Sequence, residues 1–303
     1  MPRAYRKYSR MISMLATALR VYQWPKNFVV FGALVFALEL DDPAQVLKTV
    51  LAFVAMCAAS STIYLLNDLI DIEKDRAHPE KKKRPLASGA LSVQVAVAML
   101  VVLGAGSLTL AFFLRLEFAS AVICYLALNL FYSFLLKNIM LVDVMAIAVS
   151  FVIRGIAGAL VIDVVFSNWL VVCTLFLALF LALGKRRREI GLLEEEAIKH
   201  REVLGHYSVP YLDALMIVLA ATTLLAYTIY TCSPEVVERL HTDKLYISLP
   251  FVVYGLFRYL YLVHHKEGGG DPSRTLVRDV PLLATVLLWG LTNVAIIYGR
   301  GII

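Results

Sequence analysis

The sequence predicts an all-α polytopic membrane protein, and three observations support that prediction. The chain has 303 residues, of which 60% are hydrophobic. Apolar runs of about 20 residues, the length that a helix needs to cross a bilayer, recur along the whole chain. These runs are continuous and do not alternate between apolar and polar residues, so they fit membrane helices better than the strands of a membrane barrel.

Nine spans are predicted in chain order, at residues 28–40, 46–66, 92–114, 117–135, 140–162, 167–184, 211–231, 245–263 and 280–299. Nine crossings place the two termini on opposite sides of the membrane. Of the 29 Lys and Arg residues, 22 fall in segments on the side of the N-terminus and five in segments on the other side. Because cytoplasmic loops carry the excess of Lys and Arg, we expect a cytosolic N-terminus in a multi-pass plasma-membrane protein. Residues 1–303 then form a single transmembrane domain, with two long cytosolic loops at 67–91 and 185–210.

The first long loop opens with an acidic motif. Asn67, Asp68, Asp71 and Asp75 have the spacing N-D-x-x-D-x-x-x-D. If the second span continues as a helix, the three carboxylates share one face and repel one another. A divalent cation would offset this repulsion, and Mg²⁺ prefers carboxylate and phosphate oxygens. The motif therefore predicts a Mg²⁺–diphosphate site, against the alternative of a solvated charge run at a helix end.

Basic residues follow the acidic motif. Lys83 and Arg84 end a run of four cations, and the turn-forming sequence P-L-A-S-G comes directly afterwards. Cations beside a metal-binding carboxylate cluster suit a polyanionic ligand, although a run of lysines can also be a cytosolic anchor. Lys26, in the sequence Q-W-P-K-N before the first span, is equally compatible with an interfacial anchor and with a phosphate contact.

Further polar residues lie at the fourth and fifth spans. Tyr132 and Lys137 lie where the fourth span ends, and Asp143 and Arg154 lie within the fifth. Charges inside a span are costly, and they usually face a cavity or a partner. Asp143 and Arg154 are 11 positions apart, close to three helical turns, so they share a helix face. They predict either a contribution to a cavity or a structural pairing through another helix.

Taken together, these motifs resemble the UbiA superfamily of intramembrane prenyltransferases. The resemblance extends over essentially the whole chain and rests on Q-W-P-K-N, N-D-L-I-D-I-E-K-D, R-P-L-A-S-G and the two long loops. It implies nine transmembrane helices around a cavity that opens to the cytosol and sideways to lipid. Members typically carry a second aspartate motif after the sixth span. This chain has Lys185, Arg186 and Arg187 there, in the sequence G-K-R-R-R-E-I.

That departure, together with Y-S-F-L-L-K-N, resembles the branch of the superfamily that transfers phosphoribose to decaprenyl phosphate. The resemblance implies a Mg²⁺-dependent enzyme with phosphoribosyl pyrophosphate as donor and a polyprenyl phosphate as acceptor, serving synthesis of a cell-wall arabinose donor. It makes Asp68, Asp71, Lys26 and Arg84 the candidate catalytic residues, and Asn67, Asp68, Asp71 and Asp75 the candidate metal ligands. The candidate substrate-binding residues are Lys26, Lys83, Arg84, Tyr132, Lys137, Asp143, Arg154, Lys185, Arg186 and Arg187.

Two alternative functions stay open. An aromatic prenyltransferase of the same fold would attach a polyprenyl chain to a phenolic acid, but the missing second aspartate motif argues against it. A non-catalytic transporter of a lipid or small solute would also contain intramembrane charges. We expect no nucleic-acid partner. The sequence leaves open the length of the lipid chain and whether the protein forms an oligomer.

Overall fold

The computed structural model describes residues 3–77, 81–193, 202–265 and 272–299, and all regular elements in these ranges are helices. Eight elements of this part are long and apolar enough to cross a membrane. They are α3 (Pro43–Ile70), α5 (Val93–Leu114), α6 (Leu116–Phe134), α7 (Val142–Ile162), α8 (Asn168–Leu193), α10 (Val209–Cys232), α12 (Leu249–His265) with the preceding 3₁₀ helix η5 (Lys244–Ser248), and α14 (Val280–Tyr298). The predicted all-α membrane fold is confirmed.

The segment predicted as the first span, 28–40, has a different form. The chain makes a 3₁₀ helix, η1 (Val21–Val30), and then the six-residue helix α2 (Phe31–Phe36). Pro25 lies inside η1 and has no N–H to donate to a regular helix. Arg20, directly before η1, has the left-handed φ of 52°. A ninth continuous membrane helix is therefore not confirmed, because this part of the described chain is a broken segment.

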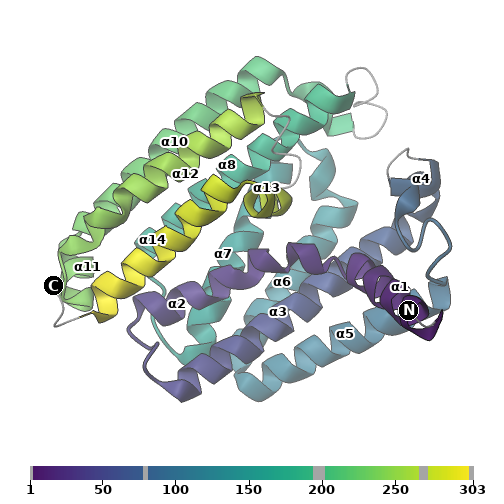
Figure 1. Cartoon of the computed structure of the whole chain (residues 1–303), viewed down its shortest axis with the longest axis horizontal. Helices are drawn as coiled ribbons and strands as arrows, with labels where there is room; N and C mark the ends of the chain where they lie inside the picture. Colours follow the sequence, from purple (N-terminus) through teal and green to yellow (C-terminus); the bar gives the residue numbers. More distant parts are fainter. Residues whose placement is uncertain (1–2, 78–80, 194–201, 266–271, 300–303) are drawn as a thin grey trace.

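Helix α7 lies between two apolar cores of the bundle (Figure 1). The first core joins Ile162 of α7 to Met56 of α3 and Phe118 of α6. The second joins Val144, near the other end of α7, to Phe180 of α8 and to residues of α10 and α12. Since α7 contributes to both cores, it fixes the position of the N-terminal helices relative to the C-terminal ones.

The broken segment packs very closely against α7. A Cβ atom at Gly158 of α7 would lie 2.1 Å from the carbonyl oxygen of Val30, at the end of η1. Only glycine allows two backbones to approach this closely. The glycine therefore determines how near η1, which carries Lys26, can come to the centre of the bundle.

Polar segments gather at one end of the molecule, whereas Tyr298 at the end of α14 lies at the opposite end (Figure 1). The polar end contains α4 (Ile72–Ala77), η2 (Lys81–Lys83) and the last turns of α8. The loops predicted at 67–91 and 185–210 are partly helical, because α3 continues to Ile70 and α8 to Leu193. Their residues 78–80 and 194–201 lie outside the described residues.

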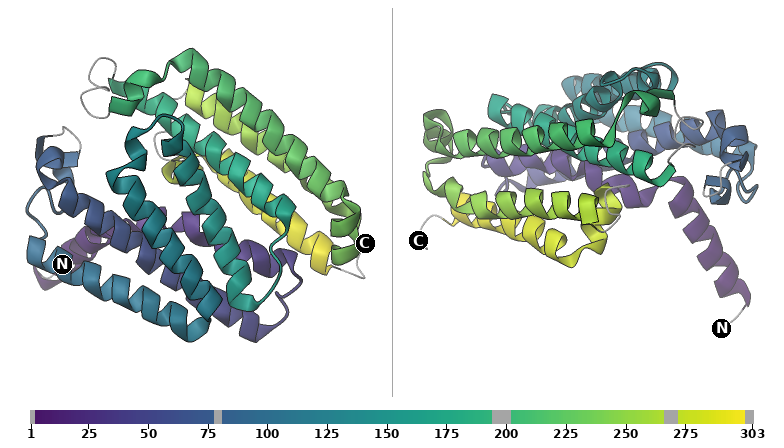
Figure 2. Two further views of the ribbon diagram at one scale, coloured as in Figure 1. Left: turned by 180° about the vertical axis from the view of Figure 1, so that it is seen from behind. Right: turned by 90° about the horizontal axis from the view of Figure 1, so that it is seen from above.

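Short elements complete the described chain. Helix α1 (Arg3–Ala18) projects from the bundle at the polar end, as the view from above shows (Figure 2). The others are η3 (Leu136–Asn138), η4 (Glu202–His206), α11 (Pro234–Leu240) and α13 (Pro272–Arg278), of which α13 packs against η1.

Candidate active site

Asp68, near the end of α3, is the centre of a buried charge cluster. Its Oδ1 accepts hydrogen bonds from Arg20 at 2.5 Å and from Arg84 at 3.1 Å. Arg84 also donates to Oδ2 of Asp75 at 2.5 Å, so one guanidinium joins two carboxylates that are 5% and 3% exposed. Buried carboxylates are costly without paired cations, and the two arginines explain why both acids can be buried. We call these four residues the Asp68 cluster.

A tight turn fixes the backbone of Arg84. Its N–H donates to the carbonyl of Lys81, and its own carbonyl accepts from the N–H of Ser88, both at 2.9 Å. Gly89 ends the turn at φ +78°, a conformation that residues with a Cβ rarely adopt. The turn expected from P-L-A-S-G is therefore present, and it holds the guanidinium beside Asp68 and Asp75.

The acidic motif does not form one continuous helical face. Helix α3 ends at Ile70, Asp71 is its C-cap, and α4 begins at Ile72. The N–H of Asp75 still donates to the carbonyl of Asp71 at 2.8 Å, so the chain keeps its direction across the break. In the described part of the chain, no three His, Cys, Asp or Glu side chains are grouped closely enough to hold a metal ion.

The oxygen donors of this motif still suit Mg²⁺. Proteins usually hold Mg²⁺ through one or two carboxylates together with phosphate groups of the substrate, so a group of three acids is not required. Oδ2 of Asp68 and Oδ1 of Asp75 accept no hydrogen bond from any described residue, and Asn67 and Asp71 are half-buried in the same segment. A bound diphosphate would give Arg20 and Arg84 a new partner and leave these oxygens to the metal ion.

A second cluster surrounds Arg186 on α8, whose side chain is fully buried. Its Nε donates to Asp143 at 2.5 Å and its Nη1 to Glu189 at 2.6 Å, while Nη2 donates to the Tyr132 hydroxyl at 3.1 Å. The Tyr207 hydroxyl donates to the second oxygen of Asp143 at 2.8 Å. Burial raises the pKa of Tyr207, and the hydrogen bond to Asp143 also raises it. We call these five residues the Arg186 cluster.

Lys81 of η2 is close enough to both clusters to interact with their charges. These charges belong to Arg84 and Asp75 of the Asp68 cluster, to the neighbouring Asp71, and to Glu189 of the Arg186 cluster. Burial and Arg84 lower the pKa of Lys81, and together they outweigh the carboxylates, which raise it. An additional anion beside this lysine would favour its charged form.

Lys185 connects the Arg186 cluster to the N-terminal segment. Its Nζ lies 3.8 Å from Glu189, and its charge interacts with those of Arg186 and of Lys26 in η1. Lys26 and Lys185, which are far apart in the sequence, therefore contribute positive charge to the same region. The fold thus brings together the predicted residues of Q-W-P-K-N and G-K-R-R-R-E-I.

Arg154 belongs to a separate network in the interior of the bundle. Its guanidinium donates to Asn27 at 2.8 Å, to the Tyr125 hydroxyl at 2.9 Å and to the carbonyl of Ser150 at 2.9 Å. It makes no ion pair with a carboxylate of the described residues. It lies 11 positions after Asp143 in the sequence, which is about 16 Å along α7. Arg154 and Asp143 therefore lie in different networks, and Arg154 holds Asn27, the neighbour of Lys26.

Three other predicted residues lie outside the two clusters. Arg187 points to the C-terminal helices, where it donates to Asp213 at 2.5 Å and to the carbonyl of Val263 at 3.1 Å. Lys83 lines a surface cleft beside α1. Lys137 is half-buried on η3.

The sequence prediction does not include Arg20, Glu189 and Tyr207, although all three belong to the clusters. Burial lowers the pKa of Arg20, but Asp68, Tyr22 and Tyr64 together outweigh burial, and the pKa is raised. Glu189 follows Arg186 at the helical spacing of three, a signal that becomes visible once α8 is extended beyond 184. Arg20 and Tyr207 have no such local signal, because only the fold brings them to Asp68 and Asp143.

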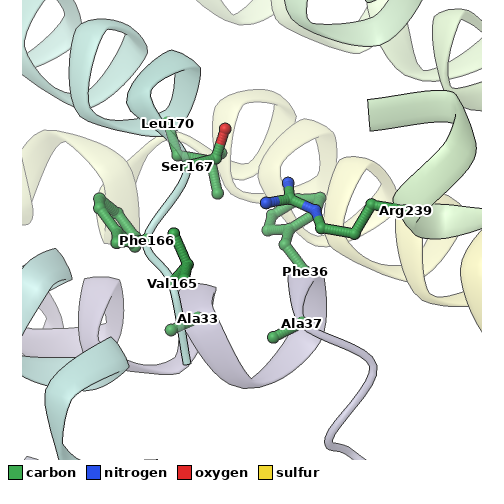
Figure 3. Close-up of a pocket in the computed structure, with 8 residues that line it drawn as sticks. All are labelled: Ala33, Phe36, Ala37, Val165, Phe166, Ser167, Leu170 and Arg239. Carbon is green, nitrogen blue, oxygen red and sulfur yellow. The ribbon is translucent and has the colours of Figure 1, made fainter. Parts of the chain in front are cut away.

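A small, partly open pocket at the opposite end of the bundle contains none of the predicted residues. It lies between α2, α8 and α11, with Phe36, Ser167 and Arg239 among its lining residues (Figure 3). Its volume is about 10 Å³, room for about one water molecule. A nucleotide-sized substrate does not fit there, so the two clusters at the polar end are the better candidate.

Comparison with known proteins agrees with this architecture. Residues 28–192 match the UbiA prenyltransferase family. The decaprenyl-phosphate phosphoribosyltransferase of Mycolicibacterium smegmatis is 32% identical over 297 residues, which cover 95% of this chain and 93% of that protein. The enzyme with the same name from Corynebacterium glutamicum is 32% identical over 289 residues, covering 93% and 86% of the two chains.

A solved structure has the same fold. It is a UbiA homolog from Archaeoglobus fulgidus bound to GPP and Mg²⁺, with a TM-score of 0.70 and 19% identity. The alignment covers 94% of this chain and 99% of that one. The fold and the family match together show that the chain belongs to the UbiA prenyltransferase family.

Proposed function

We propose that this protein transfers 5-phosphoribose from phosphoribosyl pyrophosphate to a polyprenyl phosphate and releases diphosphate. The observation that carries the proposal is the presence of two charge clusters at the polar end, one around Asp68 and one at the cationic end of α8. The charge of Lys81 interacts with both clusters. Carboxylates with Mg²⁺ suit one diphosphate, and arginine and lysine suit further phosphate groups. The names of the relatives from M. smegmatis and C. glutamicum support the same substrates.

The Asp68 cluster is the proposed site for the diphosphate of the donor. Asp68, Asp71 and Asp75, with the amide oxygen of Asn67, would hold Mg²⁺, which neutralises the charge of the diphosphate. Arg84 already lies beside these acids, and its guanidinium is free to bind phosphate oxygens when the metal takes the carboxylates. Lys26 adds a further cation that stabilises the departing diphosphate.

The cationic end of α8 is the proposed site for the other phosphate groups. Lys185 is half-buried and carries the accessible charge of this region, whereas Arg186 already donates to Asp143, Glu189 and Tyr132. Arg186 therefore positions Glu189 and Tyr132, and Lys185 with Lys26 binds the 5-phosphate or the phosphate of the lipid. Arg187 is held by Asp213 and supports the helix.

The reaction needs alignment more than proton transfer. An oxygen of the polyprenyl phosphate attacks the anomeric carbon, the bond from that carbon to the diphosphate oxygen breaks, and diphosphate leaves with the electron pair. The attacking phosphate is already anionic near neutral pH, so no general base is required. Attack opposite to the leaving group inverts the configuration at the anomeric carbon. The lipid-linked product would serve as a precursor of an arabinose donor for the cell wall.

An assay with the purified full-length protein tests this proposal. Radiolabelled phosphoribosyl pyrophosphate and polyprenyl phosphate should give a labelled lipid with Mg²⁺, none with excess EDTA, and again a labelled lipid when Mg²⁺ is restored. Absence of labelled lipid, together with prenylation of a phenolic acid from a polyprenyl diphosphate, would replace the proposal by an aromatic prenyltransferase. Absence of both reactions, with lipid or solute transport that survives Asp68→Ala, would indicate a transporter.

A further inference from the structure

A surface cleft separates α1 from the turn that carries Arg84. Its volume is about 440 Å³, and Ser13, Met14 and Thr17 of α1 line one side, with Lys83, Pro85 and Ser88 on the other. Helix α1 is held above the turn by Met14 and Ala18, which pack with Leu86 in one apolar cluster. No residue of the Asp68 or Arg186 cluster lines the cleft, so it is distinct from the proposed active site.

The cleft is positively charged. Lys83 is exposed and has no ion pair or hydrogen bond with any residue of the described ranges. The hydroxyls of Thr17 and Ser88 donate to the backbone carbonyls of Ser13 and Pro85, which leaves Lys83 as the charged donor. The first 38 residues of the chain contain six Lys and Arg and no Asp or Glu. Lys83 therefore favours an anionic occupant of this cleft.

Helix α1 also exposes an apolar face. Tyr8, Met11 and Ile12 have the helical spacing of three and four and are 63%, 46% and 64% exposed. The helix projects from the bundle at the end where the transmembrane helices reach the polar segments (Figure 2). A helix with one apolar and one basic face lies in the interface of a bilayer, with its apolar side chains at the boundary between headgroups and acyl chains.

We propose that this cleft binds the phosphate headgroup of an anionic glycerophospholipid in the adjoining membrane leaflet. Lys83 donates to the phosphate, and Tyr8, Met11 and Ile12 insert beside the acyl chains of the same leaflet. The apolar face of α1 places the helix and its cleft at the membrane interface, where phospholipid headgroups supply the anion that Lys83 favours. This site does not depend on the proposed reaction, and the two can fail separately.

Native mass spectrometry of the purified full-length protein tests the lipid site. With phosphatidylglycerol or phosphatidylcholine added at equal concentration, the protein should retain phosphatidylglycerol preferentially. Lys83→Gln should weaken that retention about fivefold, the effect of one lysine near a phosphate. Lys82→Gln is the matched control, because Lys82 is the adjacent exposed lysine and does not line the cleft. Equal losses in the two variants would overturn the proposal in favour of unspecific surface charge.

A second variant distinguishes the contribution of the cleft's shape to lipid binding from the contribution of its charge. Ser13→Trp keeps the net charge and fills the cleft, and because Ser13 is exposed the variant should unfold at the same temperature as the wild type. It should lose phosphatidylglycerol as Lys83→Gln does; full retention would contradict the proposal.

Displacement of the bound lipid by inorganic phosphate or by phosphoribosyl pyrophosphate would assign the cleft to soluble phosphates. Displacement by polyprenyl phosphate at equal concentration would assign it to the acceptor. Either result would overturn the phospholipid site.

Discussion

The arginines that bind other side chains of the bundle fall into two groups according to their partners. Arg186 and Arg84 each donate a hydrogen bond to a carboxylate oxygen at 2.5 Å. Arg154 donates only to neutral oxygens of the described residues. A buried ion pair stabilises little compared with apolar packing, but loss of one partner leaves an expensive uncompensated charge. The effect of a substitution therefore depends on which group an arginine belongs to, and on whether a ligand can replace its partner.

Asp68 carries the negative charge at the centre of the Asp68 cluster. Asp68→Asn keeps the size of the side chain but removes the charge that binds Arg20, Arg84 and the proposed Mg²⁺. We expect transfer to fall at least about a hundredfold, the range seen when one charge-stabilising group is lost. The measurement is initial rate at saturating substrates as a function of Mg²⁺ concentration.

The matched control for this variant is Asp163→Asn. Asp163 is exposed at the opposite end of α7 and pairs there with Arg115 at 2.6 Å. Its loss should leave the rate unchanged, because exposed ion pairs contribute little. Equal losses in the two variants would show that the rate responds to general destabilisation and not to the Asp68 cluster.

Asp143 and Arg186 form an ion pair in which both side chains are fully buried. Arg186→Met leaves the Asp143 carboxylate without its cation and should destabilise the protein by about 3–5 kcal/mol. The double variant Asp143→Leu with Arg186→Met removes both charges and should recover most of that loss. Thermal unfolding in detergent measures both; a double variant less stable than Arg186→Met alone would show that the pair itself stabilises the fold.

At the scale of elements, the main departure from the sequence prediction is the first span. Its apolar run indicates a membrane segment, but a hydrophobic pattern does not distinguish a continuous helix from the broken segment of η1 and α2. Two local features explain the break: Pro25 inside η1 and the left-handed Arg20 before it. Lys26 lies in this broken segment, close enough to Lys185 for their charges to interact.

The close approach of η1 to α7 depends on Gly158. Gly158→Ala places a Cβ 2.1 Å from the carbonyl oxygen of Val30, so η1 must shift. We expect a cost of about 1–3 kcal/mol, as in other overpacked interiors. A higher KM for phosphoribosyl pyrophosphate should accompany it, because Lys26 moves with η1. Thermal unfolding and steady-state kinetics measure the two effects.

Gly106→Ala is the control for the element-scale prediction. Gly106 lies in α5, and a Cβ at that position would have no neighbour within 4 Å. Alanine is the better helix former, so this variant should be as stable as the wild type or slightly more stable. A similar loss in both variants would contradict the assignment of the cost to the contact with Val30, because Gly106 makes no such contact.

For the molecule as a whole, the sequence predicts the fold class and the type of site. It predicts much less well which residues contact one another. Long apolar runs are local signals, and they give the all-α membrane fold and eight of its spans. The acidic motif and the basic end of α8 are local as well. The partners of these residues are distant in the sequence. Asp68 binds Arg20 from 48 positions away, and Asp143 binds Arg186 from 43 positions away. Such pairings follow from helix packing, which no short pattern encodes.

The most direct test of the proposed reaction is a competition in one reaction mixture. The purified protein receives Mg²⁺, phosphoribosyl pyrophosphate, polyprenyl phosphate, a polyprenyl diphosphate and a phenolic acid, and mass spectrometry identifies the products. We predict polyprenyl phosphoribosyl phosphate and free diphosphate in equal amounts, and formation of both at least about a hundredfold slower with Asp68→Asn. A prenylated phenolic acid, without any phosphoribosylated lipid, would contradict the proposed function.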